Sequence, residues 1–205
     1  MDNFEKLFDK KEKFALKIVR HFPKCITPNL LTLIRLLLLP LIIRLILIEE
    51  NIWALVVFAL AYLTDVFDGP IARYRKLSSK FGVMFDGFVD KVVFLTVLIV
   101  AGYKYLPPAL IISLIILDLG VLIIAPIIKI FINKKKWRIE LKANIYGKLK
   151  MFFEFTGVVI LLFNPFSNVI ILASTIFLFI GIIFSLISII LYISAITIAP
   201  DRRDK

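Results

Sequence analysis

The chain has 205 residues, of which 60% are hydrophobic, and it carries a formal net charge of +11. A soluble domain of this length could not bury so many long apolar runs, so the composition indicates a membrane protein with several spans. The basic charge then points to an anionic membrane face rather than to nucleic acid. The single cysteine, Cys25, excludes an intrachain disulfide, and the charged residues that recur from position 2 onward predict no cleavable signal peptide.

Residues 2–22 are predicted to form an amphipathic helix. Apolar side chains recur there at steps of three and four residues, and basic side chains fill the opposite face. A helix of this kind lies on a membrane surface, although docking against a partner protein would give the same pattern. Residues 1–26 are therefore expected to be a cytoplasmic juxtamembrane segment.

Six membrane-spanning helices are expected after this segment, so the predicted fold class is all-α. Thr27 is suited to cap the first helix, with Pro28 at its first helical position. Turns are expected where polar residues or prolines interrupt the apolar runs, at 49–51, 107–108 and 164–165. The spans cover about 30–48, 52–72, 81–105, 110–132, 151–163 and 169–198, within one domain of residues 27–199 that is followed by a basic tail, 200–205.

The distribution of basic residues predicts the orientation of these spans. Lys and Arg concentrate in residues 1–26, 73–80, 133–150 and 201–205, whereas the opposite loops hold only Lys104. By the positive-inside rule, both termini and the 73–80 connection lie on the cytoplasmic side. Arg35 lies deep in the first span, where a charge that faces lipid is costly. It is expected either to face a polar interior or to form a structural ion pair.

Four aspartates gather where the second span ends and the third begins. Asp65 and Asp68 are three residues apart, and Asp86 and Asp90 are four apart, so on helices each pair shares one face. Carboxylates at membrane helices are costly and are functional by default. Four of them together would repel one another unless divalent cations were bound, and carboxylate oxygens suit Mg²⁺ or Mn²⁺.

The stretch from Asp65 to Asp90 reads D-x2-D-G-x2-A-R-x8-G-x3-D-x3-D. It resembles the signature of the CDP-alcohol phosphatidyltransferases at all eight fixed positions, and Thr27-Pro28-Asn29 and Arg35 extend the likeness upstream. The resemblance implies an integral-membrane homodimer that transfers a phosphatidyl group from CDP-diacylglycerol to an alcohol and releases CMP. It also implies metal dependence, with two Mg²⁺ or Mn²⁺ ions.

The same resemblance assigns roles to the motif residues. Asp65, Asp68 and Asp86 would be metal ligands, and Asp90 would be both a metal ligand and the general base. Arg73 has a planar fork that suits phosphate oxygens. The CDP pocket would be formed by Asp65, Asp68, Gly69, Ala72, Arg73, Ser79 and Gly82.

The acceptor is less sharply indicated, and the chain is most like the phosphatidylglycerophosphate synthases. Lys91 follows Asp90 as in the glycerophosphate-accepting and cardiolipin-forming branches, and residues 147–150 resemble a segment of the former. Lys91, Lys142, Lys148 and Lys150 are therefore candidates to bind the phosphate of glycerol 3-phosphate, although the positive-inside rule alone would also place lysines in the 133–150 connection. Gly87 and Asp118 depart from the usual pattern of that branch.

Other functions stay open at this point. Within the family, the acceptor could be an inositol phosphate, serine or another alcohol, the reaction could form cardiolipin, and the donor could be a CDP-linked ether lipid. Outside it, a small cation transporter would explain the carboxylates, but it would not explain Gly69, Arg73 and Gly82 at their spacings.

Overall fold

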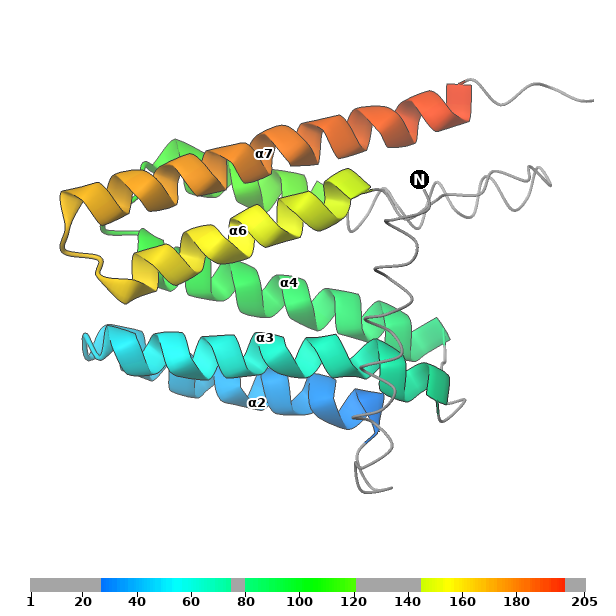
Figure 1. Ribbon diagram of the computed structural model, residues 1–205, viewed down its shortest axis with the longest axis horizontal. Coiled ribbons are helices and arrows are strands. Elements are labelled where there is room, and N and C mark those ends of the chain that lie inside the picture. The colour runs from blue at the N-terminus through cyan, green and yellow to red at the C-terminus, as the bar shows by residue number, and fades with distance from the viewer. Residues whose placement is uncertain (1–26, 75–79, 121–144, 198–205) are drawn as a thin grey trace, which may run out of the picture. The chain divides into compact units, whose positions relative to one another are not determined.

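The computed structural model describes residues 27–74, 80–120 and 145–197, and these residues form helices joined by short turns, without a strand. The all-α class is therefore confirmed for the part of the chain that is described. The helices are α2 (Pro28–Leu47), α3 (Asn51–Tyr74), α4 (Lys80–Gly102), α6 (Ile145–Phe163) and α7 (Asn168–Thr197), and residues 108–120 are also helical (Figure 1). The predicted juxtamembrane segment 1–26 and the tail 200–205 lie outside the described residues.

Helix α2 begins where the sequence predicts. The hydroxyl oxygen of Thr27 accepts a hydrogen bond from the backbone N–H of Leu30 at 3.3 Å, and Thr27 has the extended backbone of an N-cap. Pro28 occupies the first turn, where its missing N–H leaves no hydrogen bond unmade. The entry of the chain into α2 is thus fixed by two adjacent residues.

The predicted turn at 49–51 is a Schellman motif. The N–H of Glu50 donates to the carbonyl of Leu45 at 2.9 Å, and the N–H of Glu49 donates to that of Ile46 at 3.0 Å. Glu49 has a φ of 63°, the left-handed conformation that this motif requires. The motif ends α2 and turns the chain into α3, which packs against α2 (Figure 1).

The chain divides into two compact units, residues 1–93 and 94–205, and each is described by itself. In the first unit, a stripe on α2 is buried at intervals of three and four residues, and α3 has a matching stripe. These spacings place each stripe on one helix face. The stripes consist of Leu31, Arg35, Leu39, Ile42 and Ile46 on α2, and of Ala54, Phe58 and Ala61 on α3.

In the second unit, α6 packs against α7 in antiparallel fashion. Gly157 of α6 faces Leu178 of α7, and earlier in α6 Glu154 faces Gly181, which is later in α7. The buried hydroxyl of Ser174 donates to the carbonyl of Gly157 at 2.8 Å. Small residues therefore let the two helices approach closely, and the buried hydrogen bond from Ser174 to Gly157 joins them.

Two of the described helices are long and apolar enough to cross a membrane: α2, and α7 over Asn168–Leu191. Residues 51–64 and 108–120 form shorter apolar helices. By length and composition these helices are consistent with a membrane protein.

Candidate active site

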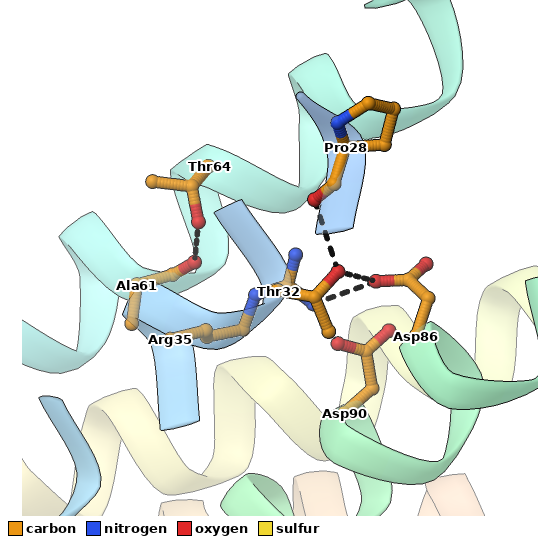
Figure 2. Close-up of polar contacts among 7 residues, drawn as sticks. All are labelled: Pro28, Thr32, Arg35, Ala61, Thr64, Asp86 and Asp90. Atoms are coloured by element: carbon orange, nitrogen blue, oxygen red, sulfur yellow. Dashed lines mark hydrogen bonds and ion pairs between the residues drawn. The ribbon is translucent and has the colours of Figure 1, made fainter. Parts of the chain in front are cut away.

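Two of the four motif aspartates form the centre of the candidate site. Asp86 and Asp90 lie one helical turn apart on α4, and both face α2 (Figure 2). The hydroxyl of Thr32 donates to Oδ1 of Asp86 at 3.1 Å. Nη1 of Arg35 contacts the same oxygen at 3.4 Å and also pairs with Oδ1 of Asp90. The sequence prediction that these two carboxylates share a helix face is therefore confirmed.

The two sides of this cluster differ in burial. Thr32 and Arg35 are each only 1% exposed, whereas the side chains of Asp86 and Asp90 are 31% and 15% exposed. The contacts from α2 thus hold the carboxylates from a closed side. The carboxylates themselves remain partly exposed.

Arg35 carries the one positive charge in this cluster of four described side chains. A guanidinium cannot lose its proton in a protein, so burial requires anionic partners. With both aspartates ionised, the cluster has a net charge of −1. The structure therefore answers the question about Arg35 that the sequence left open: it forms an ion pair, and its partners are motif carboxylates.

The remaining motif residues are placed only by their backbone. Asp65, Asp68, Gly69, Ala72 and Arg73 lie in the last turns of α3, and their side chains are outside the described part of the structure. Residues 75–79, which include Ser79, lie outside it as well, and Gly82 lies in the first turns of α4. The two aspartate pairs thus lie on either side of residues 75–79 in the sequence, one near the end of α3 and one near the start of α4. The described side chains include no group of three or more acidic, His or Cys residues that could hold a metal, so the four-carboxylate site stays a prediction.

The candidate acceptor lysines fall in different environments. Lys91 is half-exposed on α4 and Lys148 is exposed in the first turn of α6, whereas Lys142 lies outside the described residues. Lys150 is 4% exposed. Its ammonium group pairs with Asp118 and lies 3.7 Å from Oε1 of Glu154, and both of these carboxylates are buried.

The sequence did not predict three of these contacts: those of Lys150 with Asp118 and Glu154, and that of Thr32 with Asp86. Glu154 lies four residues after Lys150 and thus on the same helix face, and Asp118 lies in an apolar span, where a carboxylate needs a cation. For Thr32, the available signal is its position three residues before Arg35, on the same face of the helix.

The family model for CDP-alcohol phosphatidyltransferases matches residues 25–197. The chain belongs to the CDP-alcohol phosphatidyltransferase family. Family membership confirms what the aspartate motif indicated.

Several relatives share part of this domain. CDP-diacylglycerol–glycerol-3-phosphate 3-phosphatidyltransferases from Cereibacter sphaeroides and Rickettsia typhi are 43% identical over 89 residues and 42% identical over 69 residues. A putative cardiolipin synthase from Mycobacterium tuberculosis is 35% identical over 82 residues. These matches cover 41%, 32% and 40% of this chain, and 40%, 39% and 39% of the relatives, so the chain spans about two-fifths of their length. No solved structure matches the chain.

Proposed function

We propose that this protein transfers a phosphatidyl group from CDP-diacylglycerol to glycerol 3-phosphate and releases CMP. The observation that carries the proposal is the Asp86–Asp90 pair, held side by side on α4 and partly exposed, within a domain of this family. The relatives from C. sphaeroides and R. typhi are named for the same reaction.

The residues suit this chemistry. A pyrophosphate repels an oxygen nucleophile until its charge is neutralised, and two Mg²⁺ or Mn²⁺ ions would supply that neutralisation. Asp65, Asp68, Asp86 and Asp90 would hold the ions, because hard divalent cations prefer carboxylate oxygens. The fit rests on the donor chemistry of Asp86 and Asp90, whose carboxylates are partly exposed beside one another.

The bond changes follow from the substrates. The acceptor hydroxyl oxygen forms a bond to the phosphorus of the phosphatidyl group, and the bond from that phosphorus to the oxygen of the CMP phosphate breaks. Asp90 would take the hydroxyl proton. Arg73 would bind the pyrophosphate, with Gly69, Ala72, Ser79 and Gly82 bordering the CDP moiety.

A phosphorylated acceptor needs cations close to the site. Lys148 is exposed and is the stronger candidate on α6, because Lys150 is buried between two carboxylates. Lys91 and Lys142 are the other candidates. The M. tuberculosis relative favours one alternative, cardiolipin synthesis, in which phosphatidylglycerol would be the acceptor.

The membrane arrangement is part of the proposal. We propose six spans, a surface helix at the N-terminus, and both termini and the aspartates on the cytoplasmic side. A homodimer is proposed by family resemblance, with the third and fourth spans at the interface. A monomeric mass in mild detergent together with full activity would argue against that assembly.

The reaction is tested with the full-length protein in detergent, supplied with CDP-diacylglycerol, Mg²⁺ and a panel of acceptors that includes glycerol 3-phosphate, phosphatidylglycerol, inositol phosphate and serine. We expect CMP and phosphatidylglycerophosphate with glycerol 3-phosphate.

Asp86→Asn should lower the rate of CMP release by about 10²-fold or more, because transition-state charge stabilisation is lost. Glu49→Gln in the exposed turn should leave this rate unchanged. Ion flux in vesicles without CMP release would favour a cation transporter, and full turnover in excess chelator would overturn the metal requirement.

A further inference from the structure

The contacts to Asp86 and Asp90 from α2 all use one edge of each carboxylate. Thr32 and Arg35 reach Oδ1 of Asp86, and Arg35 reaches Oδ1 of Asp90. Within the described part of the chain, neither Oδ2 atom has a hydrogen bond or ion pair. Each carboxylate therefore has one edge fixed to α2 and one edge left for another ligand.

The α2 side of this arrangement is buried. Thr32 and Arg35 are buried and lie three residues apart, so they project from the same face of α2. The hydroxyl oxygen of Thr32 also lies 3.2 Å from the carbonyl oxygen of Pro28, so the one hydroxyl proton has two alternative acceptors, this carbonyl and Oδ1 of Asp86.

We propose that Thr32 and Arg35 are positioning residues, which hold Asp86 and Asp90 by their Oδ1 edges so that the Oδ2 edges face a divalent cation. The inference rests on the proposed metal-dependent function and adds to it a specific task for α2. Groups that orient metal-binding carboxylates change metal affinity or activity by about 10–100-fold when they are removed. Arg35 also has an electrostatic effect. Asp86, Asp90 and Arg35 together carry a net charge of −1, whereas the two ionised aspartates alone would carry −2.

Thr32→Val is the cleanest test, because it removes the hydroxyl without changing charge or shape. Mn²⁺ binding to the full-length protein in detergent is measured by electron paramagnetic resonance, alongside kcat and KM for CMP release. We expect Mn²⁺ affinity to fall by about 10–100-fold, and Thr32→Ser to restore it. Thr175→Val is the matched control, because the Thr175 hydroxyl donates to the carbonyl four residues earlier and, within the described part of the chain, contacts no carboxylate.

A second variant keeps the test decisive if Thr32→Val does not fold. Arg35→Lys preserves the charge but replaces a planar fork with a single flexible ammonium group, so a loss of Mn²⁺ affinity would report geometry rather than charge. We expect a loss of about tenfold or more.

The outcomes separate this inference from the proposed function. A wild-type protein that binds no Mn²⁺ would overturn the metal-dependent function and this inference with it. A wild-type protein that binds Mn²⁺ and releases CMP, together with folded Thr32 and Arg35 variants of unchanged affinity, would overturn the inference alone.

Discussion

Two lysines on α6 show how strongly the surroundings decide what a residue can do. Lys148 and Lys150 are two positions apart, a spacing that places them on different sides of a helix. Lys148 is exposed, whereas Lys150 is buried with Asp118 and Glu154. Because its ammonium group is buried beside two carboxylates, Lys150 is poorly suited to bind an anionic acceptor.

Substituting the two lysines should therefore have different effects. Lys150→Met would break the buried ion pair with Asp118 and remove the ammonium group beside Glu154, at a cost of about 3–5 kcal/mol. Lys148→Met should have a smaller effect on stability, because Lys148 is exposed, and should raise the apparent KM for glycerol 3-phosphate by about 10–100-fold, because a contact from a charged group to phosphate is worth about 1.5–3 kcal/mol. Thermal unfolding in detergent and steady-state kinetics measure the two effects. Equal behaviour of both variants would contradict this division of roles.

At the scale of helices, the turn between α2 and α3 contains one residue in an unfavourable backbone conformation. Glu49 adopts a left-handed conformation that non-glycine residues reach at a cost of about 1–2 kcal/mol. Glycine is the usual residue at this position of a Schellman motif. Glu49 is thus held in place by the hydrogen bonds of the motif rather than by its own preference.

Glu49→Gly should stabilise the protein by about 0.5–1 kcal/mol, once the larger unfolded-state entropy of glycine is subtracted. The midpoint of thermal unfolding reports the change. Glu50→Gly is the control, because positive φ is confined to Glu49 among the described non-glycine residues, and it should give no gain. A gain of equal size at Glu50 would show that the left-handed conformation is not the cause.

At the α6–α7 contact, by contrast, we expect the replacement of a glycine by a larger residue to destabilise the protein. A Cβ added at Gly157 would lie 2.7 Å from the Leu178 side chain and 3.3 Å from its backbone nitrogen. Gly157→Ala should therefore destabilise the protein by about 1–3 kcal/mol, as overpacking does. At Gly120 an added Cβ meets nothing within 4 Å, so Gly120→Ala should be neutral or gain up to about 1 kcal/mol from helix propensity. Comparable unfolding midpoints for the two variants would rule out close packing at Gly157.

The sequence predicts the helices and the motif, because both are encoded at short range. The Thr27 cap, the turn after α2 and the shared face of Asp86 and Asp90 depend on neighbours within a few residues. The pairing of Lys150 with Asp118 spans 32 positions, and no local spacing encodes it. Uniformly apolar helices also give little indication of which face is buried, so the contact of Thr32 with Asp86 could not be predicted either.

At the scale of the whole molecule, the proposed orientation can be checked with the single cysteine. Cys25 should react with a membrane-impermeant maleimide in inverted vesicles and not in right-side-out ones, because the segment before α2 is expected to be cytoplasmic. Tyr103→Cys in a Cys25→Ser background should show the opposite pattern, since Tyr103 is exposed in the turn after α4. Labelling of both cysteines from the same side would contradict the proposed topology.

The length of α7 has a consequence for the membrane around it. Its apolar stretch, Asn168–Leu191, has 24 residues and is about 36 Å long at ~1.5 Å per residue, whereas a typical hydrocarbon core is about 30 Å thick. The 20 residues of α2 match that thickness. If α7 spans the bilayer, hydrophobic mismatch makes it tilt or thicken the lipid next to it. Lipids with longer acyl chains would relieve this mismatch at α7 and create one at α2. No single membrane thickness would therefore match both helices of the enzyme when they stand upright in the bilayer.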